Sequence, residues 1–172
     1  RVKTIIDLGP MADKVRMQLR DLAIQTGRSL KETMGGYYQV VSAGIKNATD
    51  TAKVLRVTLQ ATEGGQAYFE IVVKALTRTM RNYGVEMDDA RQTMDAMLKA
   101  VELGQIEMPE LANVVGRVAN AAGAANARLN EMLAALGLMA QKGKPEIVAT
   151  QLRAFFLSLA KPTQQTITAL EE

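Results

Sequence analysis

Several residue types that support enzyme chemistry are missing from this chain. It has no cysteine, which excludes disulfides and thiolate nucleophiles. It has no histidine, which removes the most common general base and the most common metal ligand. Only three serines are present, and without histidine none of them can belong to a Ser-His pair. We therefore expect no enzymatic activity, no catalytic or cofactor-binding residues, no metal site and no cofactor.

Long apolar runs and aromatic side chains are also scarce. The longest apolar stretch, Met132–Ala140, has nine residues and contains Gly137, whereas roughly 18 are needed to cross a bilayer. We expect no stable membrane span, and no signal peptide is recognisable. Because aromatics make up only 4% of the chain, aliphatic residues and ten methionines must fill the core. The chain begins with Arg1 rather than Met, which indicates a fragment of a longer polypeptide.

Charge is distributed unevenly along the chain. Residues 1–60 carry a net charge of +5, residues 61–110 carry −4, and residues 111–172 carry +2. The basic and acidic segments can attract each other, within one chain or between copies. A basic stretch without interleaved aromatics is either a solvated helix face or a contact for DNA phosphates or an acidic partner. Its members are Lys14, Arg16, Arg20, Arg28 and Lys31.

The apolar residues recur with the period of a helix rather than that of a strand. Four segments place them at i, i+3 or i+4, and i+7, with charged residues opposite. Glycine and proline breaks divide the chain into eight or nine helices of roughly 10–18 residues. The predicted fold is all-α, a compact bundle of short antiparallel helices. The four stripes are Met11, Val15, Leu19, Leu22 and Ala23; Phe69, Val72, Val73, Leu76 and Met80; Ala90, Met94, Met97, Leu98 and Val101; and Val148, Leu152, Phe155, Phe156 and Leu159.

Local signals indicate where these helices start and end. Gly27 and Gly84 are typical of the glycine that follows a helix. Ser29 with Glu32 has the spacing of a capping box, and Thr49 or Asp50 is expected to cap a later helix. Further expected breaks are Gly44 and Asn47, Gly64-Gly65, Gly104, Pro109 as a first helical residue, Gly123, Gly143 with Pro145, and Pro162.

One short segment resembles another 79 positions later. Ser42–Asn47 is similar to Ala121–Asn126, and each is expected between two helices. Two related halves, 1–83 and 84–172, explain this similarity as well as two hairpins with similar turns do. In either case we expect one helical domain over residues 1–172.

Two motifs point toward ligand chemistry but have simpler explanations. Gly137–Lys144 resembles a phosphate loop, but the glycine spacing is one residue too long and Pro145 stands where Ser or Thr must hold magnesium. Glu86, Asp88 and Asp89 could bind a hard cation or act as an acid–base pair, but acidic residues at a helix start are usually caps.

Small residues are concentrated in two places. Gly35-Gly36-Tyr37-Tyr38 interrupts a helical pattern, which indicates close packing or a kink, or else a hinge or a partner contact through the tyrosines. A second pattern predicts a tight helix–helix contact at Gly116 and Ala119, within the domain or between copies. That stripe is Ala112, Gly116, Ala119, Gly123 and Ala127.

The second half of the chain carries a longer string of short motifs. Together these motifs resemble the core region of phage tail tape-measure proteins, and the similarity extends back to about Gly27. The segments that carry it are Tyr83–Ala90, Met108–Gly116, Ala134–Leu138, Leu152-Arg153 and Leu159–Thr163.

The resemblance implies a structural virion protein that acts in tail assembly. Such a protein sets tail length, occupies the lumen of the tail tube and leaves ahead of the DNA at infection. Its implied partners are other copies of itself, tail-tip or baseplate proteins, tail-tube proteins and assembly chaperones; the basic stretch gives only weak support for DNA contact. It would lie inside the phage tail, and in the host cytoplasm during assembly. The alternative is a cytoplasmic helical adaptor that binds proteins through one hairpin face.

Overall fold

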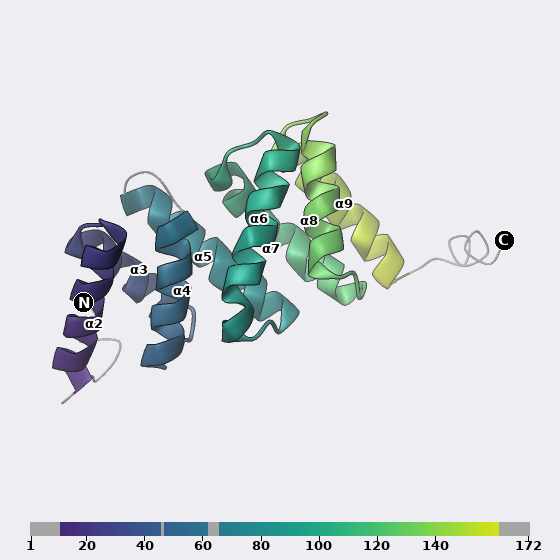
Figure 1. Ribbon diagram of the computed structural model, residues 1–172. Helices are drawn as coiled ribbons and strands as arrows, with labels where there is room; N and C mark the ends of the chain where they lie inside the picture. The colour runs from purple at the N-terminus through teal and green to yellow at the C-terminus, as the bar shows by residue number, and fades with distance from the viewer. Residues whose placement is uncertain (1–10, 46, 62–65, 162–172) are drawn as a thin grey trace. The chain divides into compact units, whose positions relative to one another are not determined.

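Every regular element of the computed structural model is helical within the described residues, which are 11–45, 47–61 and 66–161. These ranges contain eight α-helices, one short 3-10 helix and no strand, which confirms the all-α prediction (Figure 1). The elements are α2 (Met11–Thr26), α3 (Leu30–Ser42), α4 (Ala48–Ala61), α5 (Gln66–Tyr83), η1 (Met87–Asp89), α6 (Ala90–Gly104), α7 (Met108–Ala124), α8 (Leu129–Ala140) and α9 (Pro145–Ala160).

Two kinds of local signal set the helix ends as predicted. Gly27 after α2 has a φ of +65° and Gly84 after α5 has a φ of +61°, a conformation that favours glycine. At the start of α3, the Ser29 hydroxyl accepts the Glu32 amide at 3.2 Å. The Glu32 carboxylate accepts the Ser29 amide in return at 3.0 Å. These two bonds satisfy amides that have no partner inside the helix, and they confirm the capping box.

The cap of α4 differs from the prediction. Asn47 takes this role instead of Thr49 or Asp50, because its Oδ1 accepts the Thr49 amide at 2.8 Å. The same oxygen lies 3.4 Å from the Asp50 amide. Asparagine is one of the best residues for this position, since its short side chain reaches back to the first helical amides.

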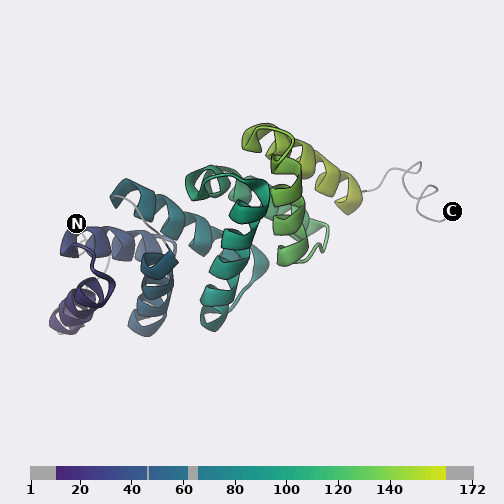
Figure 2. The same ribbon diagram turned by 45° about the horizontal axis from the view of Figure 1, so that its top comes forward.

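The chain forms two compact units, which we describe separately. Unit 1 consists of residues 1–80 and 85–94. Within it, α2, α3 and α4 pack against one another, and η1 packs against α4 (Figures 1 and 2). The core of unit 1 contains the predicted stripes of α2 and α5, except that the side chain of Met11 lies outside the described residues. Its most deeply buried apolar residues are Val40, Val54, Leu55, Phe69, Val72, Val73, Leu76 and Met80.

Three buried threonines of unit 1 bond to the backbone carbonyl four residues earlier in the chain. The hydroxyl of Thr51 donates to the Asn47 carbonyl at 2.8 Å, and that of Thr58 donates to the Val54 carbonyl at 2.8 Å. Thr77 donates to the Val73 carbonyl at 2.9 Å in the same way. Because each hydroxyl bonds four residues back, these threonines enter the core without needing a polar partner on another helix.

Unit 2 consists of residues 81–84 and 95–172. Its most extensive helix contact is between α7 and α9, and α8 contacts both (Figure 2). The apolar residues that these three helices bury include Leu111, Val114, Val115, Val118, Met132, Leu133, Leu136, Val148, Leu152 and Phe156.

A close helix approach in unit 2 is built from glycines on α6 and α8. A methyl group on Gly137 would lie 2.8 Å from the carbonyl oxygen of Ala100. A methyl group on Gly104 would lie 3.1 Å from the carbonyl oxygen of Gly137. The side chain of Gln141 adds a hydrogen bond to the Leu103 carbonyl at 2.6 Å. The two backbones are in direct contact here, so the glycine at position 104 is needed for helix packing. The left-handed residue that follows α6 is Gln105, with a φ of +52°.

The predicted tight contact at Gly116 is wrong within the chain. A methyl group on Gly116 would have no atom within 4 Å outside its own helix backbone. Ala119, in contrast, is fully buried. The close-packing interpretation holds for Gly36 in unit 1, where a methyl group would lie 2.2 Å from the ring of Phe69 and 2.9 Å from Leu55. Position within the three-dimensional packing, rather than spacing of small residues, decides which glycine is constrained.

The two similar segments adopt different turns. After α3, the left-handed residue is Gly44, with a φ of +100°. After α7 it is Asn126, with a φ of +57°, whereas Gly123 lies inside the helix. The aligned glycines therefore occupy different positions, and the expected break at Gly123 is wrong. Because the two turns differ in this way, their geometry does not support an internal duplication.

Candidate interaction surfaces

Of the three carboxylates considered as a chemical site, Asp88 has a structural contact. Asp88 forms an ion pair with Lys53 of α4, which holds η1 against that helix. Glu86 occupies the position before η1 and Asp89 ends it. In the part of the chain that the structure describes, no three His, Cys, Asp or Glu side chains gather into a group that could hold a metal ion.

The segment that resembles a phosphate loop is mostly helix. Gly137 lies within α8, which continues to Ala140, and its Cα faces the backbone of α6. Only residues 141–144 separate α8 from α9. These four residues are too few to form the glycine-rich cradle that a phosphate loop needs before its helix.

The exposed face of α2, which carries Arg16 and Arg20 of the basic stretch, has both signs of charge. Arg16 lies 3.8 Å from Asp13, and both side chains are largely exposed. The centre of this face is apolar, since Met17 is 65% exposed and Ile24 is 74% exposed. The side chain of Lys14 lies outside the described residues. Acidic and apolar groups among the bases favour a solvated face or a protein contact over a phosphate backbone.

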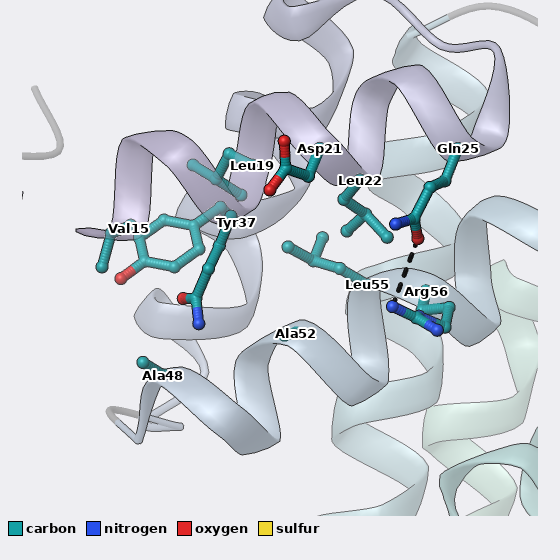
Figure 3. A pocket seen from close by; sticks show the side chains of 11 residues that line it. Val15, Leu19, Asp21, Leu22, Gln25, Tyr37, Ala48, Ala52, Leu55 and Arg56 are labelled. Atoms are coloured by element: carbon teal, nitrogen blue, oxygen red, sulfur yellow. Dashed lines mark hydrogen bonds between the residues drawn. The ribbon is translucent and has the colours of Figure 1, made fainter. Parts of the chain in front are cut away.

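A groove of about 210 Å³ lies between α2 and α4 (Figure 3). Both helices run from left to right in the figure, with Val15 and Ala48 at one end and Gln25 and Arg56 at the other. The space exists because α4 presents only Ala48 and Ala52 toward α2 along much of this length. The buried floor is apolar and consists of Leu19 and Leu22 of α2, Tyr37 of α3 and Leu55 of α4.

The rims of the groove are polar. Arg56 Nη2 donates to Gln25 Oε1 at 3.3 Å and joins the two rims at one end (Figure 3). Asp21 lies on the α2 rim and forms no ion pair with any residue in the described ranges. Burial raises the pKa of Tyr37, so its phenol stays neutral in the groove at neutral pH. An apolar floor beside one unpaired carboxylate suits an apolar side chain that is accompanied by a cation.

The second surface is the outer face of α9, which is uncharged. Ile147 is 55% exposed and Phe155 is 54% exposed. The rest of this α9 face consists of Gln151, Ala154 and Ser158, all exposed. At about 100° per residue these five positions share one side of the helix. Solvent-facing helix surfaces usually carry charge, so this α9 face is typical of a contact surface.

This exposure corrects the sequence interpretation of α9. Val148, Leu152 and Phe156 are buried as predicted, but Phe155 and Leu159 of the same stripe are exposed. The Phe155 ring meets the Phe156 ring edge-on, with centroids 5.5 Å apart. The apolar pattern predicts one buried stripe of five residues, but the helix buries only the narrower side that faces α7 and α8.

Sequence reasoning also missed the groove. Tyr37 was noted as a candidate contact residue beside the paired glycines, and the structure places it in the groove floor, 3% exposed. The available signal was the spacing of Ala48 and Ala52, which leaves a shallow helix face. That signal becomes interpretable only when the neighbouring helix is known.

Comparison with known proteins now identifies the context of these surfaces. Residues 16–172 match the protein family described as phage-related minor tail protein. The chain belongs to the phage-related minor tail protein family.

A curated relative adds detail to this family assignment. The chain is 28% identical over 161 residues to the "Tape measure protein" of Pneumococcus phage Dp-1. This match covers 92% of the chain but 14% of the relative, so the chain spans about one seventh of that protein's length. No solved structure matches the chain.

For a minor tail protein, the groove and the α9 face are surfaces of the described residues whose make-up suits protein contacts. No helix among the described residues has both the length and the apolar character needed to cross a membrane.

Proposed function

We propose that this chain is the helical core segment of a tape-measure protein that sets phage tail length during assembly. The observation that carries the proposal is the match of residues 16–172 to the minor tail family together with similarity to a tape-measure protein. This match favours a tail component over a cytoplasmic adaptor. The full-length protein occupies the tail-tube lumen within the virion and leaves ahead of the DNA.

Residues 1–172 act in this proposal as one core domain with a contact role and no catalytic role. Its partners are other copies of itself, tail-tip and tail-tube proteins and assembly chaperones. The chain supports a contact role through the groove of unit 1 and the uncharged α9 face of unit 2. Measuring length then depends on other parts of the full-length protein.

Deletion of residues 84–163 from the full-length protein in its phage tests this division of roles. We expect no assembled tails in electron micrographs, because the contact surface of unit 2 is lost. If these 80 residues were part of the ruler, tails would instead be shorter by up to roughly 120 Å, at 1.5 Å per helical residue. A phage carrying Gly116→Ala, which leaves the packing unchanged, is the control. Normal, infectious tails from the deletion would contradict the proposal.

A further inference from the structure

We propose that the outer face of α9 in one copy docks lengthwise into the groove between α2 and α4 of another copy. This inference rests on the proposed function in one respect, which is that several copies assemble together. It names the two surfaces through which they would meet.

The two surfaces match in length and chemical character. The groove follows α2 from Val15 to Gln25, which is roughly 15 Å at 1.5 Å per residue. The α9 face extends from Ile147 to Ser158, roughly 16 Å on the same scale. Ile147 and Phe155 are two helical turns apart on that face, as expected for the anchors of a helix that lies in an apolar groove.

Charges of opposite sign stand beside the two surfaces, together with Arg56 on the groove rim and Glu146 in the first turn of α9. Asp21 on the groove rim has no ion-pair partner among the described residues. Lys142 and Lys144 are exposed immediately before α9, and they too form no ion pair in the described ranges. The N-terminus of α9 adds the positive end of the helix dipole. A docked α9 with its N-terminus near Asp21 would therefore pair charges that are unpaired in a single copy.

The contact joins two different surfaces, so it is heterologous. In a pair of copies, the copy that gives its α9 face keeps a free groove, and the copy that gives its groove keeps a free α9 face. Such contacts form a closed ring where the rotation between copies closes, and an open chain where it does not. This property separates the proposal from a symmetric dimer, in which the same patch would meet itself.

The experiment measures the mass of the purified 172-residue chain by light scattering over a range of concentrations. We expect association that is lost in an anchor variant, Ile147→Ser with Phe155→Ser, because both changed side chains are exposed and the fold is kept. Leu138→Ser, at another exposed apolar residue of unit 2, is the matched control and should associate normally. Circular dichroism verifies the helical content of every variant.

The groove is tested with Asp21→Lys, which should weaken association about tenfold by placing like charges together. Asp13→Lys makes the same charge change on the same helix outside the groove and should have no effect. Ala52→Phe fills the groove and should also prevent docking; if it fails to fold, Asp21→Lys still tests the site. Combining Asp21→Lys with Lys142→Asp and Lys144→Asp should restore association.

Mixing the variants gives the decisive result. The anchor variant keeps a working groove, and the Ala52→Phe variant keeps a working α9 face. The mixture should form a one-to-one complex that grows no further, although neither variant associates alone. A wild-type chain that stays monomeric at all concentrations, or variants that do not complement, would overturn the proposal. The tail phenotype of the deletion phage is read separately, so the proposed function can stand if this contact fails.

Discussion

The glycine crossing of α6 and α8 makes a quantitative prediction when two helical glycines are compared. Gly137 and Gly116 both lie inside long helices of unit 2. Replacing either with alanine improves helix propensity by about 1 kcal/mol. The two sites differ in space, because a methyl group meets the Ala100 carbonyl at 2.8 Å from Gly137 but meets nothing within 4 Å from Gly116.

The expected sign of the change is therefore opposite at the two sites. At Gly116 the propensity gain is not opposed, so Gly116→Ala should stabilise by about 0.5–1 kcal/mol. At Gly137 the new methyl group must push apart two backbones, and overpacking of this kind costs about 1–3 kcal/mol. After subtraction of the propensity gain, Gly137→Ala should destabilise by about 1 kcal/mol. The two variants should differ by about 2 kcal/mol.

Thermal melts followed by circular dichroism measure this difference. For a chain of this size, about 1 kcal/mol shifts Tm by roughly 2–4 °C, so the variants should melt roughly 4–8 °C apart. Urea unfolding with an unchanged slope would show that the effect is on native stability. If Gly137→Ala melts at or above the temperature of Gly116→Ala, the close approach of α6 and α8 does not exist in solution.

Three further variants test other parts of the packing. Gly36→Ala should lower the free energy of unfolding in urea by about 2–3 kcal/mol, because its methyl group would overlap the Phe69 ring. Adding Phe69→Leu to the same chain should recover part of this stability. If the loss stays unchanged, this result would argue against the contact. Ser29→Ala should cost about 1 kcal/mol at pH 7. The hydrogen bonds from Ser29 lower the pKa of Glu32. The stability that they contribute is therefore present above the ordinary glutamate pKa of about 4.3 and is lost as pH falls through the lowered value. Melts at pH 3 should show a smaller loss of stability in Ser29→Ala than melts at pH 7. Tyr83→Phe removes a buried hydroxyl without a partner and should not destabilise at pH 7. Burial, and the nearby Glu131 carboxylate, raise the pKa of Tyr83 to about 12. Above pH 10 the phenol ionises in the unfolded chain but stays neutral in the folded chain, so the wild type loses stability as pH rises from 10 through 12. The variant should lose less stability over this range, and a larger loss would contradict this reasoning.

The parts of the fold that could be predicted depend on neighbours in the sequence. The bounds of α5, Gln66–Tyr83, follow from its apolar period and from Gly84. The capping box at Ser29 needs only the residue three positions later. Such features are set by hydrogen bonds within one helical turn, so the sequence alone contains the information.

The parts that failed depend on contacts between helices. Gly123 and Gly137 are both expected in turns from the sequence, but each lies inside a helix, because whether a glycine ends a helix or faces another element depends on the packing partner. Phe155 shows the same limitation, because the apolar pattern of α9 is wider than the surface that its neighbours cover. The groove depends on the placement of α2 beside α4, which no local pattern specifies.

The direct contact of α6 and α8 constrains how this chain can vary in evolution. Insertion of one residue into either helix rotates every later position by about 100°. Such a rotation between Ala100 and Gly104, or between Gly137 and Ala140, would bring a larger side chain to a position where main-chain atoms of the other helix lie too close to admit it. Substitutions on the opposite helix cannot remove the nearest opposing atoms, because these are the main-chain carbonyl oxygens of Ala100 and Gly137. Relatives should therefore differ in the lengths of the connections while these two helical segments keep their length.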